Sequence, residues 1–179
     1  MSLPKKTIFS AGFTLLELMI VVTIIGIISA GLIPAFSNYI RSQNLKQAQE
    51  QLKSDMRTVQ NKALTGALSD QLLGSTYIKY WGIKFFKGQS TYDYFVSISS
   101  AACPAGPPYA AGVYQGKGSF GSDLKIQNAS TCVFFDIANG DVVSSLLSGG
   151  SGFASVGYSA TELKKVFFNS YGLIYSTNE

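Results

Sequence analysis

Histidine is absent from this sequence of 179 residues. Without an imidazole, the chain cannot form a Ser-His-Asp or Cys-His nucleophile system, an HExxH zinc site or the usual proton shuttle at neutral pH. Cysteine is scarce as well: the chain has two, too few for a tetrahedral zinc site when no histidine can complete it. Most hydrolase mechanisms therefore lose their central residue, and we expect no metal and no cofactor.

Charged residues are also few, and they nearly balance. Lys and Arg number 14 and Asp and Glu number 10, which gives a net charge of +4. Lys5 and Lys6 stand near the start of the chain, so the rest is close to neutral. This composition lacks the basic stripe of a nucleic-acid-binding protein. The length allows one domain of ordinary size with an appendage, and the apolar fraction of 46% is enough for a hydrophobic core.

A long apolar run near the N-terminus is the strongest pattern in the sequence. Between Phe13 and Ile33 the only charged residue is Glu17. These 21 residues would form a helix of roughly 31 Å, the thickness of the hydrocarbon core of a bilayer. Lys5 and Lys6 precede the run, and the next cation is Arg41. The positive-inside rule therefore predicts a cytoplasmic N-terminus and an exported remainder.

Three hypotheses compete for this segment. A secretory signal would be cleaved after Ile28-Ser29-Ala30, which leaves Glu17 without a purpose. A plain membrane anchor tolerates Glu17 near the interface but does not explain it. Cleavage between Gly12 and Phe13 would create a new α-amino group four residues before the carboxylate. Only this third hypothesis places a cation beside the acid.

The residues of the third hypothesis resemble a known family. Gly12 ends a short basic leader and is followed by Phe13, Thr14-Leu15-Leu16, Glu17 and an unbroken apolar stretch. This pattern is similar to that of the type IV pilins and the pseudopilins of type II secretion systems. The resemblance implies that a prepilin peptidase cuts after Gly12 and that Phe13 becomes N-methylated. It also implies that Glu17 pairs with the terminal amine of a neighbouring subunit during assembly on an inner-membrane platform.

Physical chemistry agrees with that role for Glu17. A carboxylate and an ammonium are each costly alone in an apolar medium, but they can pair when a subunit moves from lipid into a filament of similar helices. Such pairing would specify the register between subunits. An anchor with an accidental acid is the simpler alternative.

Helical periodicity continues beyond the apolar run, with an amphipathic pattern. One stripe holds the apolar residues Leu45, Ala48, Leu52, Met56, Val59 and Ala63. The charged residues lie off that stripe: Arg41, Lys46, Glu50, Lys53, Arg57 and Lys62. Gly66 is a plausible C-terminal stop, so Phe13–Thr65 could be one helix of 53 residues, roughly 80 Å long.

Pro34 falls inside this predicted helix, close to Gly26 and Gly31. Because proline has no N–H to donate and crowds the carbonyl of Ala30, we expect a kink. The kink could be a simple bend where the chain leaves the membrane. The family resemblance implies a stretch that unwinds in the filament, and both interpretations stay open.

The C-terminal part has the pattern of antiparallel strands. Tyr77–Phe86 and Tyr92–Ser99 predict a hairpin around the turn KGQS. CVFFDIA and DVVSSLL are joined through Asn139-Gly140, and KKVFFN and LIYST across Ser170-Tyr171-Gly172. We therefore expect an α+β fold with one antiparallel sheet packed on the helix stripe. This part, with VFFNSYGLIYS near its end, is similar to minor pilins and minor pseudopilins.

These patterns divide the chain into four parts. Residues 1–12 are the leader, 13–36 the membrane-spanning and filament-core half of the helix, 37–66 its amphipathic half, and 67–179 the β-rich globular part.

Cys103 and Cys132 bound a segment rich in Gly and Pro. An exported compartment permits a disulfide, which would stabilise the fold by roughly 3–4 kcal/mol on the loop-entropy model. The alternative is two free buried thiols. The glycines of YQGKGSFGSD lack the strand and helix context of a nucleotide-binding loop and predict a flexible surface loop.

Two further features have simple explanations. The aromatic residues of the first hairpin could form a binding face, but a sheet on a helix buries one face, so we expect core packing for most of them. They are Tyr77, Tyr80, Trp81, Phe85, Phe86, Tyr92, Tyr94 and Phe95. Asn128-Ala129-Ser130 matches a glycosylation sequon, a triplet that arises often by chance.

The sequence therefore predicts a structural subunit of a type IV pilus or a type II secretion pseudopilus rather than an enzyme. Its expected partners are prepilin peptidase, other pilin or pseudopilin subunits, the assembly platform and the membrane. It would first lie in the inner membrane and then in an extracytoplasmic filament. The alternative is a membrane-anchored or secreted β-rich binding or adhesion module that does not polymerise. A hidden enzyme is the third and weakest option.

Overall fold

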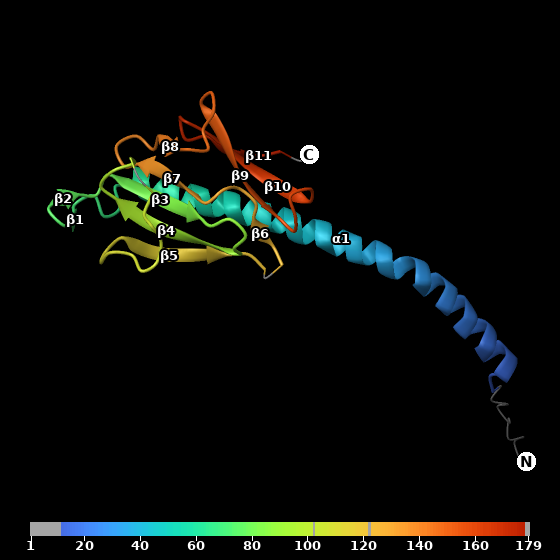
Figure 1. Cartoon of the computed structure of the whole chain (residues 1–179). Coiled ribbons are helices and arrows are strands. Elements are labelled where there is room, and N and C mark those ends of the chain that lie inside the picture. The colour runs from blue at the N-terminus through green and yellow to red at the C-terminus, as the bar shows by residue number, and fades with distance from the viewer. Residues whose placement is uncertain (1–11, 102, 122, 178–179) are drawn as a thin grey trace, which may run out of the picture. The chain divides into compact units, whose positions relative to one another are not determined.

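The computed structural model describes residues 12–101, 103–121 and 123–177, with the side chains of residues 32–35 excepted. In this part of the chain a long helix, α1 (Leu15–Leu64), precedes eleven short strands (Figure 1). The contacts divide the chain into two units, residues 1–42 and 43–179. The predicted α+β class is confirmed: the second half of α1 packs on antiparallel sheets.

The end of α1 follows from Gly66, as predicted. Gly66 has a φ of 65°, which a residue with a side chain rarely adopts. Its N–H donates to the carbonyl of Ala63 at 2.9 Å, and the N–H of Ala67 donates to that of Lys62 at 3.0 Å. This pair of bonds is a Schellman motif, which satisfies carbonyls that the helix end would otherwise leave without donors.

The apolar stripe on the second half of α1 is confirmed. All six predicted residues are buried: Leu45, Ala48, Leu52, Met56, Val59 and Ala63. Polar side chains beside the stripe reach the backbone of the C-terminal strands. Gln49 Nε2 donates to the carbonyl of Lys165 at 2.6 Å, and an Arg57 guanidinium N–H donates to that of Ile174 at 2.6 Å. Hydrophobic burial therefore holds the helix face, and hydrogen bonds fix its rotation.

The larger sheet has five antiparallel strands in the order β5-β4-β3-β7-β8. Their bounds are Tyr80–Phe85 for β3, Thr91–Ser97 for β4, Tyr114–Ser119 for β5, Thr131–Asp136 for β7 and Val142–Ser144 for β8. The predicted first hairpin is present as β3 and β4, and the hairpin around Asn139-Gly140 as β7 and β8.

The second sheet has four antiparallel strands in the order β11-β10-β9-β6. Their bounds are Lys125–Ile126 for β6, Ser151–Gly157 for β9, Leu163–Asn169 for β10 and Ile174–Ser176 for β11. β10 and β11 form the predicted last hairpin. A separate two-stranded ribbon joins β1 (Leu72–Leu73) to β2 (Thr76–Tyr77). The main core contains residues of both larger sheets and of the α1 stripe.

Two expectations about the β-rich part are wrong. The strands form two larger sheets rather than one, because β9 pairs with β10 and β6 pairs with β9, and neither pairs with the first hairpin. The segment YQGKGSFGSD is not a flexible loop throughout, since its first six residues form β5. A Cβ at Gly118 would collide with the ring of Tyr92, so this glycine admits an aromatic ring against the strand.

The five-stranded sheet is covered on both faces. One face packs on the α1 stripe through residues such as Ile83, Phe85 and Val133. On the other face a second cluster contains Phe95, Cys132 and Phe134, with Tyr80 and Val113 against it. Residues Cys103–Val113, here called the strap, lead from the disulfide to this cluster and then into β5.

One side chain of α1 contacts turns from both sheets. Gln60 Nε2 lies 2.7 Å from the carbonyl oxygen of Gly172 and 3.5 Å from that of Gly140. Nearby, the N–H of Val142 donates to the carbonyl of Ser170 at 2.9 Å. The β7-β8 turn and the β10-β11 turn therefore lie side by side over the helix.

Candidate processing and assembly site

The predicted cleavage position lies in an exposed segment ahead of α1. Gly12, Phe13 and Thr14 precede the first helical residue, and 78% of Phe13 is exposed. A Cβ built at Gly12 would meet no atom within 4 Å, and its φ is not in the left-handed region. This fold therefore does not itself require glycine there. Lys5, Lys6 and the rest of the expected leader before Gly12 lie outside the described residues.

Thr14 caps the N-terminus of α1. Its hydroxyl oxygen accepts a hydrogen bond from the N–H of Glu17 at 3.2 Å, and its carbonyl accepts one from the N–H of Leu18 at 3.2 Å. A Thr followed three residues later by Glu is the sequence of a capping box. The capping role of Thr14 was not among the predictions from the sequence, although Thr14 and Glu17 have the spacing of the motif.

The cap fixes the place of Glu17 in the first turn of α1. A carboxylate at this position interacts favourably with the positive end of the helix dipole. Within the described part of the chain the carboxylate has no ion pair. The acid is therefore held at the helix start, three residues after Thr14 and four after the α-nitrogen of Phe13.

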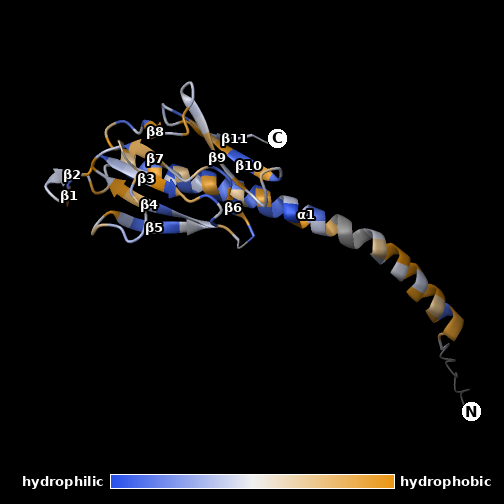
Figure 2. Cartoon of the chain, viewed as in Figure 1, coloured by the Kyte–Doolittle hydropathy of each residue, from blue (hydrophilic) through white to orange (hydrophobic). Residues whose placement is uncertain are grey.

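The first half of α1 presents an apolar surface. In Figure 2 the coloured part of this half is mostly orange, with a few pale or blue residues, whereas the second half mixes orange and blue. The exposed side chains include Leu15, Leu16, Leu18, Met19, Ile20, Val22, Ile25, Ile27 and Ile28. By length and composition, α1 can cross a membrane. Pro34 lies within α1, and the kink expected there stays a prediction.

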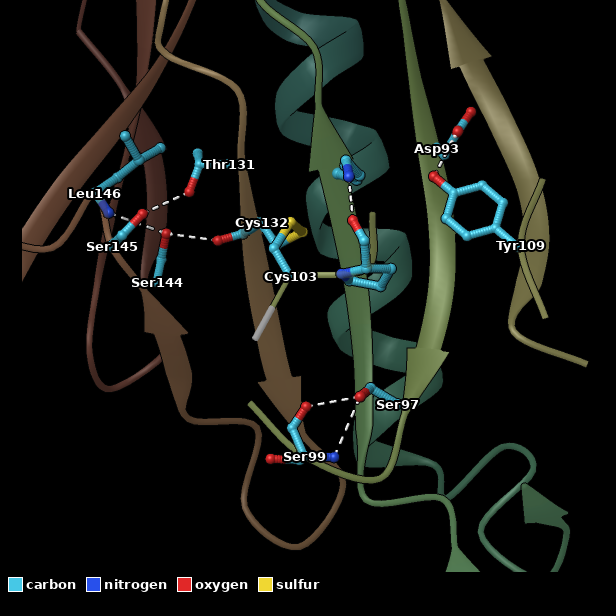
Figure 3. Close-up of a disulfide and its surroundings, with 12 residues drawn as sticks. Asp93, Ser97, Ser99, Cys103, Tyr109, Thr131, Cys132, Ser144, Ser145 and Leu146 are labelled. Atoms are coloured by element: carbon cyan, nitrogen blue, oxygen red, sulfur yellow. Dashed lines mark hydrogen bonds between the residues drawn. A yellow bond between two sulfur atoms is a disulfide. The ribbon is translucent and has the colours of Figure 1, made fainter. Parts of the chain in front are cut away.

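The two cysteines are joined in the structure. Cys103 and Cys132 form a disulfide with their Cα atoms 5.6 Å apart (Figure 3). Cys132 lies on β7 and is buried, and Ser144 on β8 donates to its carbonyl at 2.8 Å. The bridge therefore fastens the start of the strap to the interior of the five-stranded sheet.

The sequon residue Asn128 is engaged in structure. Its Nδ2 donates to the carbonyl of Phe153 at 3.1 Å, and its Oδ1 accepts a bond from the hydroxyl of Ser155 at 2.7 Å. The side-chain amide of Asn128 is therefore hydrogen-bonded to β9 through both its nitrogen and its oxygen. The aromatic residues of the first hairpin also follow the core interpretation, since Trp81, Phe85, Tyr92 and Phe95 are buried; Tyr77 is exposed.

Comparison with known proteins addresses the N-terminal pattern directly. Residues 9–33 match the family model of the prokaryotic N-terminal methylation motif. In this N-terminal part the chain is similar to the type IV pilins. It is 35% identical over 95 residues to a type IV major fimbrial protein FimA of Dichelobacter nodosus. The aligned residues make up 53% of this chain and 56% of that protein. A second FimA of this organism is 38% identical over 60 residues, 34% of this chain and 38% of the relative.

The similarity of this pilin-like chain to those fimbrial proteins is partial. The chain spans about half the length of the first relative and less of the second. No solved structure matches it. The recognition of a type IV pilin pattern from Gly12, Phe13 and Glu17 is confirmed, and the roles of these residues are proposals.

Proposed function

We propose that this pilin-like chain is a structural subunit of a type IV pilus or of a related pseudopilus, and not an enzyme. It is made as a precursor whose first helix anchors it in the inner membrane, with the N-terminus in the cytoplasm. A prepilin peptidase cleaves between Gly12 and Phe13, and Phe13 is N-methylated. The subunit then polymerises through α1 with other pilin or pseudopilin subunits on an inner-membrane platform.

One observation carries this proposal: Glu17 sits in the capped first turn of an otherwise apolar, exposed helix half, within the residues 9–33 that match a methylation motif. A charge in the bilayer core costs about 2.5–3.5 kcal/mol on insertion scales, so a lone carboxylate favours any assembly that gives it a cation. Cleavage after Gly12 supplies that cation on every subunit. Pairing of Glu17 with the amine of a neighbour then sets the axial register.

The exposed apolar half of α1 supplies the remaining driving force. In a filament its side chains pack against the same helix of neighbouring subunits, and the β-rich part, whose core includes the stripe on the second half of α1, faces outward. A membrane-anchored binding module that does not polymerise would need the same apolar helix but neither the cut nor the carboxylate.

The N-terminal mass of the mature chain tests this proposal. We expect a chain that begins at Phe13 and carries one methyl group on its α-nitrogen. A mature chain that begins at Gly31 or retains Met1 would exclude the filament function. Gly12→Ala and Gly12→Leu form a matched pair, because a Cβ at that position would meet no atom of this fold within 4 Å. We expect the precursor with alanine to be cleaved and the one with leucine to accumulate uncut.

A further inference from the structure

A cavity of about 630 Å³ opens on the strap side of the five-stranded sheet. Its wall and floor come from β4, β5, the β3-β4 turn and the strap. The lining residues are Phe86, Gln89, Thr91, Asp93, Pro107, Tyr109, Tyr114 and Lys117. This volume lies within the range of small-ligand sites in proteins, about 300–1,000 Å³. The cavity lies far along the sequence from α1 and has no part in the proposed assembly.

The floor of the cavity is polar and structured. Asp93 on β4 is only 7% exposed, and the Tyr109 hydroxyl donates to its Oδ2 at 2.7 Å (Figure 3). Burial, and then the hydrogen bond to Asp93, raise the pKa of Tyr109, so its phenol keeps its proton at neutral pH. The strap thus contributes a fixed hydroxyl that points at a buried carboxylate.

Two lysines flank that carboxylate in the sheet register. Asp93 pairs with Lys84 on β3 and with Lys117 on β5. The Lys84 ammonium donates to the strap carbonyl of Pro104 and lies 5.2 Å from the centre of the Phe86 ring. The ammonium of Lys84 is therefore bonded within the protein, whereas Lys117 is exposed and lines the cavity. Asp93, Lys84 and Lys117 together carry a net charge of about +1.

The wall of the cavity is aromatic. The rings of Tyr109 and Tyr114 stack with centroids 5.6 Å apart and planes at 17°. Tyr114 is 45% exposed although it lies on a strand. A large flat surface of this kind beside hydrogen-bonding groups suits a ligand with one apolar face and many polar edges.

These features select among ligand classes. A purely apolar ligand would cover the polar groups of Thr91 and Gln89 without offering them hydrogen bonds, which is costly. An amine would meet repulsion from the two lysines. Single-stranded nucleic acid needs a groove of several cations that follows its backbone, and Lys117 is the sole basic residue of the lining.

We propose that this cavity binds a saccharide that carries a carboxylate, such as a uronic acid residue. The apolar face of the pyranose ring packs on Tyr114. The sugar hydroxyls bond to Gln89 and Thr91, and the carboxylate pairs with Lys117. The strap orients the aromatic wall, so the disulfide positions the site. The proposal does not depend on filament assembly, because every residue of the site lies between Phe86 and Lys117.

Binding of two trisaccharides to the full-length chain in detergent tests this proposal. Titration calorimetry with trigalacturonate, and with a neutral galactose trisaccharide as reference, measures the two affinities. We expect tighter binding of the acidic sugar. Tyr114→Ala should weaken both sugars by about three- to tenfold, the loss of one stacking contact. Lys117→Gln should weaken the acidic sugar by about two- to fivefold, the value of an exposed ion pair, and leave the neutral one unchanged.

Two control variants match these changes elsewhere on the surface. Tyr171→Ala removes a tyrosine that is 86% exposed in the β10-β11 turn, and Lys125→Gln removes an exposed lysine of β6. Neither should alter binding. The proposal is overturned if neither sugar binds at millimolar concentration, or if both bind equally. It is overturned as well if Tyr114→Ala and Tyr171→Ala behave alike. A Glu17→Leu chain should bind the acidic sugar normally, which separates this site from the assembly function.

Discussion

The hydroxyl of Tyr92 donates a hydrogen bond to the Asp55 carboxylate. Tyr92 is fully buried on β4, and Asp55 lies on α1 beside the apolar stripe. The same ring packs against Phe120 at 5.1 Å and against Phe85 at 6.0 Å, between ring centroids. The helix α1, the five-stranded sheet and Phe120, the residue that follows β5, therefore meet at the side chain of Tyr92.

Tyr92→Phe removes the donor and keeps the ring. We expect the unfolding free energy of the full-length chain in detergent to fall by about 1–2 kcal/mol. The Asp55 carboxylate loses its hydrogen-bond donor from Tyr92, and water replaces that donor only in part. Trp81 is the only tryptophan and is buried, so its fluorescence reports urea unfolding. Tyr171→Phe is the matched control and should change nothing. An unchanged midpoint for Tyr92→Phe would mean that the hydrogen bond contributes no net stability.

Alkaline pH should destabilise the fold. Burial, and then the contact with Asp55, raise the pKa of Tyr92 well above its ordinary value of 10.0, and the pKa of Tyr94 is raised for the same reasons. Above pH 10 the unfolded chain releases these protons and the folded chain does not. The stability that the protonated phenols of Tyr92 and Tyr94 contribute is therefore fully present below pH 10 and is lost as the pH rises further.

Lys84 acts in the opposite direction at high pH. Burial lowers its pKa below the ordinary value of 10.5, so near that pH the unfolded chain binds the extra proton. Since Tyr109 shares the behaviour of Tyr92 and Tyr94, three tyrosines outweigh one lysine. Urea unfolding between about pH 8 and pH 11 measures the slope. Tyr92→Phe should give a shallower fall than wild type, and an identical slope would contradict this assignment.

The disulfide should stabilise the strap side of the sheet. Cys103 and Cys132 are 29 residues apart, and a loop of this length predicts a loss of roughly 3–4 kcal/mol when both are replaced by alanine. Non-reducing mass spectrometry with thiol alkylation shows the pairing itself. We expect no alkylated cysteine in exported protein, and two alkylated residues would refute the bridge there. Cleavage after Gly12 should be unaffected by the double replacement.

Glu17 should matter for polymerisation and not for insertion. Glu17→Leu removes a membrane-insertion cost, so the precursor should insert and be cleaved normally, yet fail to enter filaments. Glu17→Gln keeps the volume without the charge and should also assemble poorly, whereas Glu17→Asp should retain partial function. The measurement is the ratio of sheared filament to membrane pool, without wild-type subunit present.

Thr14→Val separates two roles of the first turn of α1: the capping of the helix by Thr14 and the proposed assembly role of the Glu17 carboxylate. It removes the hydroxyl that accepts the Glu17 N–H but leaves the carboxylate in place. We expect filaments of this variant to form, with a helix start weakened by about 1 kcal/mol.

If Glu17→Leu enters filaments as well as wild type does, Glu17 has no assembly role and the non-polymerising anchored module becomes the better hypothesis.

Local patterns in the sequence predicted the helix and three of the hairpins. The stripe from Leu45 to Ala63 repeats at helical spacing, and every member is buried. Asn139-Gly140 predicts a tight turn, and it joins β7 to β8. Such features depend on neighbours within a few residues, which a sequence displays directly.

The missed features depend on distant contacts. β5 and β9 are rich in glycine, which weakens any strand signal, yet Gly118 makes room for the ring of Tyr92. A Cβ at Gly152 would lie 2.5 Å from the carbonyl oxygen of Leu146, so β9 needs glycine at that close approach. The strand β4 does not alternate in burial, since the strap covers its outer face. The cavity forms only where the strap, β4 and β5 come together, and no short sequence motif predicts it.

The contacts of Gln60 with two turns constrain how the surface of this protein can diversify. Gly172 has a φ of 83°, and a Cβ on it would lie 2.8 Å from the carbonyl oxygen of Gly140. A larger residue at Gly172 would therefore displace the Gly140 turn or the Gln60 amide that both turns share on α1, and a larger residue at Gly140 would meet Leu64 of α1. Exposed turns usually drift independently during evolution. Here residues 139–141 and 170–172 should instead change in concert among homologues, and independent sequence variation should concentrate in other loops.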